Sequence, residues 1–200
     1  MDLLSILTSF GLGAAAGQRA IVPMLVIGLL HNTSFFELGE SWAWLGSPSV
    51  LVVLAVLSLA EIIVDWYPDS ARVADIAGWV TRTVSGAVLA AAVMGSLDPT
   101  LSQLVWSGAL GGTTALAMQF ARQPLRASTR ELSDSGMSGS DRASSVAETS
   151  SAVVLPAAAI AAPWAVIPLL VMGGGVLGLL VWLSRSVRGA LLRVGGLKTS

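Results

Sequence analysis

Long apolar stretches alternate with short polar ones along this chain, and the first apolar stretch runs from Leu3 to Leu30. It is 28 residues long, whereas a helix needs about 20 apolar residues to cross a bilayer. The surplus predicts a tilted helix or a helix that is broken near its glycines and Pro23. Further apolar stretches predict helices at 48–66, 78–97, 101–121, 146–162 and 163–183. The pattern therefore predicts an all-α protein with about six membrane-spanning helices.

The polar stretches predict the connections and one tail. Residues 122–145 form the longest connection, and their Ser, Arg, Gly and Pro content predicts a flexible cytoplasmic loop. Residues 185–200 form a basic tail with interspersed apolar residues, which is typical of a segment at a membrane surface. Residues 1–184 are then a single helical domain.

Composition supports a membrane protein and excludes several functions. Charged residues make up 12% of the chain, about half the share in soluble domains, and the mean hydropathy is +0.77. A net charge of −1 gives no indication of a nucleic-acid partner. The chain has no cysteine and one histidine, which excludes disulfides, thiolate ligands and multi-histidine metal sites within one chain. We find no nucleotide-binding or hydrolase motif, so we expect no enzyme and no cofactor.

The distribution of basic residues predicts an orientation. Six spans place both termini on one side of the membrane, and cytoplasmic termini put every Lys and Arg except Arg19 on or near the cytoplasmic side. Arg19 is therefore the one cation that we expect to be buried.

Arg19 has a candidate partner at similar depth. It lies 11 residues before Leu30, roughly 17 Å along a helix, and Glu61 lies 13 residues after Pro48, roughly 20 Å. An unpaired charge inside a bilayer is costly, so we expect these two side chains to pair. Such a pair is either a structural link or a site that binds an anionic group at Arg19 or exchanges protons at Glu61.

Two more carboxylates follow Glu61 at helical spacing, Asp65 and Asp69. Asp65 extends the candidate site as a step in a cation or proton path towards the cytoplasm. Asp69 follows Pro68 and fits a solvated turn better.

Glu148 admits two interpretations. With Ser145 it forms the SxxE pattern of a helix-capping box. Alternatively, it is a second carboxylate that faces the same cytoplasmic vestibule as Asp65. His31 follows the first apolar stretch and fits a solvated loop.

Small residues four apart predict close helix packing or homo-oligomerisation. They are Gly13 and Gly17, Gly108 and Gly112, and Gly174 and Gly178. Because the first and fourth spans both carry such a pair, a 3+3 inverted repeat is an open alternative.

Four motifs occur in order: GLGAAAGQRAIVP at 11–23, ExxxDxxPD at 61–69 with Asp75 after it, RAST at 126–129, and SxxE at 145–148. Together they resemble a bacterial family of small multi-pass membrane proteins, domain-of-unknown-function family 4126. The resemblance implies a multi-pass protein of the bacterial cytoplasmic membrane and no assigned activity. The chain departs from the family pattern at Thr149, where an aspartate is usual.

Two functions fit these observations. The first is a small secondary transporter or carrier for an ion, a small anionic metabolite or a lipid phosphate, with Arg19, Glu61, Asp65 and Glu148 at its site. The second is a non-transporting membrane scaffold or assembly protein in which Arg19 and Glu61 form a structural ion pair.

Overall fold

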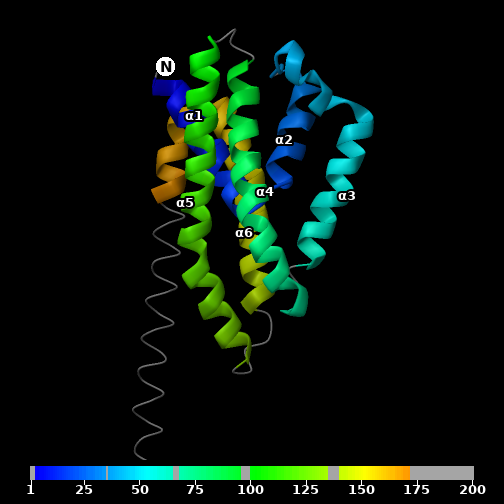
Figure 1. Ribbon diagram of the computed structural model, residues 1–200, viewed down its shortest axis with the longest axis vertical. Coiled ribbons are helices and arrows are strands. Elements are labelled where there is room, and N and C mark those ends of the chain that lie inside the picture. Colours follow the sequence, from blue (N-terminus) through cyan, green and yellow to red (C-terminus); the bar gives the residue numbers. More distant parts are fainter. Residues whose placement is uncertain (1–2, 35, 65–67, 96–99, 135–139, 172–200) are drawn as a thin grey trace, which may run out of the picture.

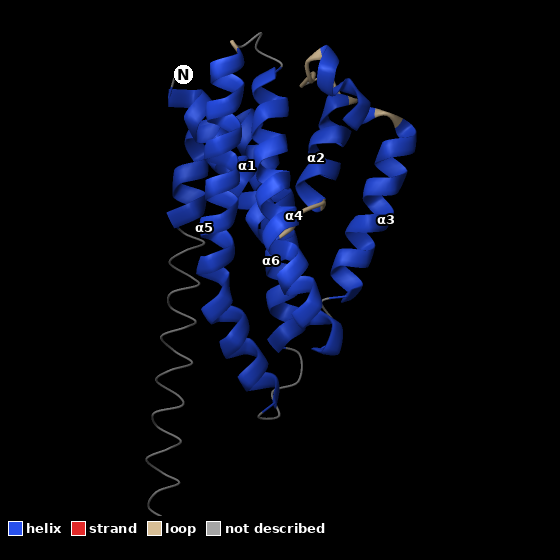
Figure 2. Ribbon diagram, viewed as in Figure 1, coloured by secondary structure: helices blue, strands red, loops and turns tan. Residues whose placement is uncertain are grey.

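The computed structural model describes residues 3–34, 36–64, 68–95, 100–134 and 140–171, which form helices and no strand (Figures 1 and 2). The helices are α1 (Leu3–Gln18), α2 (Val22–His31), the 3₁₀ helix η1 (Glu40–Gly46), α3 (Pro48–Val64), α4 (Pro68–Gly95), α5 (Leu101–Asp134), α6 (Ser140–Ala161) and the 3₁₀ helix η2 (Pro163–Ala165). Residues 166–171 are also helical. The prediction of an all-α protein is confirmed for this part of the chain.

Helix α1 forms the centre of a bundle with α4, α5 and α6 (Figure 1). Eleven of the sixteen residues of Leu3–Gln18 are buried, and most of them are Gly, Ala or Ser. Helix α3 lies at the side of the bundle, where it packs against α2, η1 and α4. The bundle therefore has a tight core and one peripheral helix.

Glycines allow the core helices to approach closely. A Cβ on Gly17 would lie 2.5 Å from the carbonyl oxygen of Ala115 in α5, and a Cβ on Gly13 would overlap the carbonyl of Gly111. A Cβ added to Gly108 or Gly112 would lie 3.3–3.4 Å from the nearest atoms of α4, which is ordinary or slightly tight contact. A Cβ would be most crowded between α4 and α5 at Gly86 and Gly111, which are not among the predicted glycine pairs.

The predicted loop at 122–145 is wrong for its described residues. Helix α5 continues to Asp134, and α6 already begins at Ser140. A proline inside a helix removes one backbone hydrogen bond and costs about 3 kcal/mol, so Pro124 favoured a loop. Arg122 and Arg126 lie on either side of Pro124 and both bind Glu148 of α6, which stabilises the helix across the proline.

Helix α4 also begins earlier than predicted. The charged turn before residue 78 forms its first turns, starting at Pro68, because proline is well tolerated at the first position of a helix. Helix α3 begins with a proline too, Pro48.

In the described ranges no single helix has both the length and the apolar composition required to cross a bilayer. One bent pair, Glu40–Gly46 with Pro48–Val64 at 58°, meets the requirement when taken together. The six spans, the orientation and the inverted repeat therefore stay predictions. Most of the sixth span, Gly174, Gly178 and the basic tail lie outside the described residues.

Candidate functional site

The first apolar stretch is broken, which is one of the two predicted alternatives, and Arg19 lies at the break. Helix α1 ends at Gln18 and α2 begins at Val22. Pro23 explains the position, because it has no N–H to bond the carbonyl of Arg19 and its ring would clash with that carbonyl. Non-helical backbone thus lies in the middle of the bundle.

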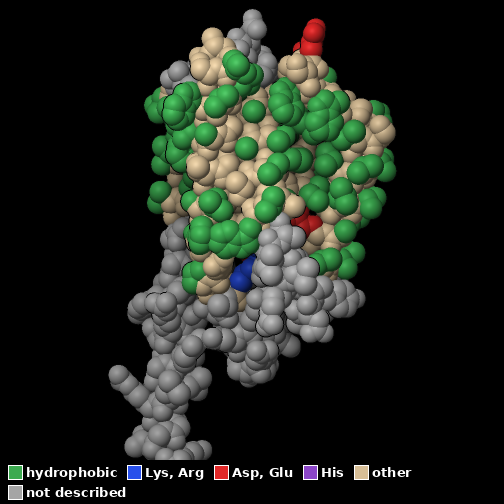
Figure 3. All heavy atoms as spheres, in the orientation of Figure 1, with side chains coloured by type: hydrophobic (Ala, Val, Ile, Leu, Met, Phe, Trp, Pro, Cys, Tyr) green, Lys and Arg blue, Asp and Glu red, His purple; other side chains and the backbone are tan. Residues whose placement is uncertain are grey.

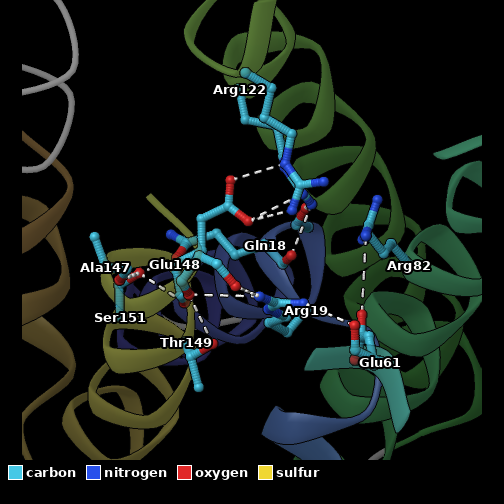
Figure 4. Close-up of polar contacts among 12 residues, drawn as sticks. Gln18, Arg19, Glu61, Arg82, Arg122, Ala147, Glu148, Thr149 and Ser151 are labelled. Atoms are coloured by element: carbon cyan, nitrogen blue, oxygen red, sulfur yellow. Dashed lines mark hydrogen bonds and ion pairs between the residues drawn. The ribbon is translucent and has the colours of Figure 1, made fainter. Parts of the chain in front are cut away.

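The guanidinium of Arg19 is fully buried and joins two other helices. Its Nη2 donates to the hydroxyl of Ser145 in α6 at 2.6 Å and to the Ser145 carbonyl at 3.4 Å. Its Nη1 donates to the backbone carbonyl of Glu61 in α3 at 3.3 Å (Figure 4). The predicted proximity of Arg19 and Glu61 is present, but this contact is to the backbone of Glu61.

The carboxylate of Glu61 is directed at the start of α2. Its Oε1 accepts the Ala20 N–H at 3.0 Å, and its Oε2 accepts the Ile21 N–H at 3.3 Å. Arg82 of α4 places Nη2 3.8 Å from Oε1. Glu61 therefore caps α2 from another helix, because the first N–H groups of a helix need outside acceptors and favour negative charge.

Arg122 of α5 binds the opposite end of the break. Its Nη1 donates to the carbonyl of Gln18 at 2.7 Å and to that of Gly17 at 3.4 Å. A cation at the last carbonyls of α1 complements the negative end of the helix dipole. The positive start of α2 thus meets a carboxylate, and the negative end of α1 meets a guanidinium group.

Glu148 holds Arg122 in place. Its Oε2 accepts from Arg122 at 3.0 Å, and Arg126 contacts both carboxylate oxygens, at 3.1 Å from Nε and 2.6 Å from Nη2 (Figure 4). The capping-box interpretation of Ser145 and Glu148 is wrong, because α6 begins at Ser140 and both residues lie inside it. Their side chains bind other helices instead.

Hydroxyl groups complete the contacts of the break. Ser85 of α4 donates to the carbonyl of Ala20, and Ser151 of α6 donates to the side-chain oxygen of Gln18. Away from the site, His31 is the last residue of α2 and does not lie in the predicted loop. Its Nδ1 atom accepts the Leu38 N–H at 2.9 Å. Asp65 lies outside the described residues, as do the side chains of Asp69 and Asp75.

Two arginines of the site, Arg82 and Arg122, are buried and do not lie at the predicted cytoplasmic interface. Arg82 and Arg122 are each 3% exposed, so Arg19 is not the one buried cation. They lie near the predicted ends of spans, where a basic residue fits the cytoplasmic interface equally well. Four residues separate Arg122 from Arg126, which places them on one helix face; this spacing was the one available sequence signal.

The break can bind groups that accept hydrogen bonds. Guanidinium, hydroxyl and backbone N–H donors converge there, and such donors recognise carboxylate and phosphate oxygens. Among the described residues we find no cluster of three or more His, Cys, Asp or Glu side chains that would hold a metal ion.

The fold and the site define a helical-bundle protein built around a discontinuous helix whose free ends meet buried charged side chains. The chain belongs to the family described as Domain of unknown function (DUF4126), whose model matches residues 6–186. The predicted family resemblance is confirmed, and the four motifs all lie within the matched range. No curated protein and no solved structure matches this chain.

Proposed function

We propose that this protein is a small secondary carrier whose substrate site lies at the break between α1 and α2. One observation carries the proposal: both half-helix ends meet charged side chains from other helices, Glu61 at the start of α2 and Arg122 at the end of α1. Non-helical backbone at bilayer depth is tolerated only where protein or a water-filled cavity surrounds it. In carriers with discontinuous helices, substrates and coupling ions bind at such half-helix ends.

The surface of the bundle supports a membrane location. Large apolar side chains are exposed on each of the long helices, for example Val52 of α3 at 64%, Val80 of α4 at 68% and Val105 of α5 at 63%. Apolar side chains cover much of the visible surface of the described residues (Figure 3). Soluble monomers rarely expose contiguous apolar areas of this kind, so lipid is the natural surrounding.

The proposal includes a location and a substrate class. The basic residues favour six spans in a bacterial cytoplasmic membrane with both termini inside. Arginine is well suited to carboxylate and phosphate groups, so the substrate is a small organic or inorganic anion or a lipid phosphate. The protein acts as a carrier and performs no reaction on that substrate.

A membrane scaffold is the second candidate, and the burial of Arg19 favours it. The guanidinium is 0% exposed and links α6 to α3 through Ser145 and Glu61, as a structural cross-link would. In that case the break fixes the shape of the bundle for a partner.

Transport into reconstituted vesicles tests the proposal. We would measure uptake of labelled acetate and inorganic phosphate, and transbilayer movement of fluorescent phosphatidic acid, against protein-free vesicles. Arg19→Lys keeps the charge but loses the planar fork that reaches Ser145 and Glu61 together, and we expect it to reduce flux by about tenfold or more. Glu61→Gln tests the other half of the site.

Glu40→Gln is the matched control, because Glu40 is an exposed acid in η1, far along the chain from the break. It should transport like the wild type. If none of the three probes moves, or if Arg19→Lys and Glu61→Gln both transport normally, the carrier proposal is wrong. A lower melting temperature of Arg19→Lys, with no flux even in the wild type, would instead support the scaffold.

A further inference from the structure

We propose that Glu61 is a tethered internal anion: its carboxylate occupies a site for a substrate oxyanion at the start of α2, and α3 withdraws it when substrate binds. The inference rests on the proposed function and adds a binding site and the element that opens it. The substrate group it implies is a carboxylate or a phosphate.

The first observation is how the start of α2 is satisfied. The N-cap residue Ile21 makes no side-chain capping bond of its own, and its N–H and that of the preceding Ala20 bind Glu61 at 3.3 and 3.0 Å. A helix start that binds one oxygen of a carboxylate on each of two N–H groups has the geometry for any planar or tetrahedral oxyanion. Here the anion is supplied by another helix of the same chain.

The second observation is a buried hydroxyl on α3, three residues before Glu61. Ser58 is 5% exposed, and its Oγ has no hydrogen-bond partner among the described residues. A buried polar group without a partner is unfavourable, so it indicates a ligand or a water that completes the site.

Helical spacing directs Ser58 at α2. On α3 it lies between Leu51, which packs against Gly28, and Glu61, which binds Ile21. Residues seven and three apart share a face of a helix, and the two helices run in opposite directions, so Ser58 faces the first turn of α2. Its hydroxyl is a third hydrogen-bond donor, on the same face of α3 as the carboxylate of Glu61.

The third observation is the loose attachment of α3. Within Pro48–Val64 the buried residues are Leu54 and Ser58 alone, whereas eleven residues of α1 are buried. Elements with few buried contacts are the ones that move at low free-energy cost. Helix α3 can therefore shift while α1, α4, α5 and α6 keep their packing.

Charge at the site favours exchange of one anion for another. Arg82 lies 3.8 Å from the carboxylate of Glu61, and the Arg19 guanidinium contacts the backbone of the same residue. A substrate oxyanion that replaces the carboxylate keeps the local charge unchanged. A neutral or cationic substrate would leave the helix start and the Arg82 guanidinium without that charge.

Acetate rescue of Glu61→Ala tests the inference, because acetate supplies the atoms that the substitution removes. We would follow the melting temperature of the purified variant in detergent while acetate replaces chloride at constant ionic strength. Binding at ten times the dissociation constant raises the melting temperature by about 3–6 °C. Wild type and Glu40→Ala, in which acetate must displace Glu61, should need a higher acetate concentration for the same shift.

Further arms identify the ligand and the role of Ser58. Inorganic phosphate and micelles containing phosphatidic acid, compared with phosphatidylcholine micelles, distinguish a free oxyanion from a lipid headgroup. Adding Ser58→Ala to Glu61→Ala should weaken acetate binding about tenfold, as expected for the loss of one hydrogen bond to a charged ligand. If Glu61→Ala folds only in acetate, the yield with and without acetate carries the same comparison.

The inference is overturned if no anion stabilises Glu61→Ala more than Glu40→Ala. It is equally overturned if Glu61→Ala does not fold even in the presence of acetate. It is also overturned if wild type shows the same shift at the same acetate concentration, because Glu61 then does not compete with acetate for the site. Rescue by acetate without any vesicle transport would show that the anion site exists but that the protein is not a carrier. Transport without rescue would leave a carrier whose site is not the start of α2.

Discussion

Glu61 and Glu148 lie on either side of the break in the first helix, and their surroundings differ (Figure 4). Glu148 is 8% exposed and holds two guanidinium groups at 2.6–3.1 Å. Glu61 is 15% exposed, lies 3.8 Å from Arg82 and binds the backbone N–H groups of Ala20 and Ile21, just before α2. Charge-assisted hydrogen bonds weaken with distance, so the arrangement around Glu148 is the stronger one.

The helix that carries Glu148 is also more extensively packed than the helix that carries Glu61. Helix α6 carries Glu148 and packs on α1, α2 and α5, whereas α3 carries Glu61 at the side of the bundle. The end of α1 is thus fixed by well-packed elements, and the start of α2 is capped by a helix with two buried residues. A discontinuous helix with one fixed end and one weakly held end can open on one side without losing the fold.

Glu148→Gln should have the largest effect on stability. It leaves Arg122 and Arg126 without the carboxylate that each now contacts, and breaking a buried pair in this way costs about 3–5 kcal/mol. Glu61→Gln retains one acceptor for the helix start, and we expect a loss of about 1.5–3 kcal/mol. Chemical unfolding in detergent, with Glu40→Gln as reference, measures both; an equal or larger loss for Glu61→Gln would reverse the comparison.

Alanine substitutions of glycines should destabilise the packing around α1 more than the packing around α3, by smaller amounts than the glutamate substitutions. A Cβ on Gly17 would lie 2.5 Å from the Ala115 carbonyl in the fixed part, and one on Gly28 would lie 2.6 Å from the Leu45 carbonyl beside α3. We expect Gly17→Ala to cost about 1–3 kcal/mol, because α1 and α5 cannot separate without disturbing Arg122. Gly28→Ala should cost less, because α2, η1 and α3 can adjust.

Gly108→Ala is the control for this prediction. Its Cβ would lie 3.4 Å from the nearest atom, the carbonyl of Ala87, and alanine favours helix, so stability should stay the same or rise. Melting temperatures of the three variants in one detergent give the order. Equal losses for Gly17→Ala and Gly28→Ala would show that both parts are equally rigid.

The parts of this structure that follow from local sequence were predictable. Apolar stretches and prolines indicated the helices, and Pro23 indicated the break, because a missing N–H and a steric clash act on the adjacent turn. The proximity of Arg19 and Glu61 followed from counting residues along two helices. These inferences need no knowledge of which faces pack together.

The rest depends on tertiary contacts that one sequence does not display. Arg82 and Arg122 look like interfacial cations until the packing of α4 and α5 on α1 buries them. Pro124 looks like a helix end until Glu148 binds the arginines on both sides of it. For the same reason, Glu61 was assigned to Arg19, although its carboxylate binds the backbone N–H groups exposed by the break.

Ser85→Ala should have the smallest effect and shows whether the two sides of the break act independently. The carbonyl of Ala20 would lose the hydroxyl that donates to it, for a cost of about 1 kcal/mol. Combined with Glu61→Gln, the loss should be non-additive by about 0.5 kcal/mol or more, because both side chains hold the segment before α2. Ser151→Ala removes a donor to Gln18 on the other side, so its effect should add to that of Glu61→Gln. Unfolding free energies of these single and double variants complete the test, and strong coupling between Ser151 and Glu61 would mean that the break responds as one rigid unit.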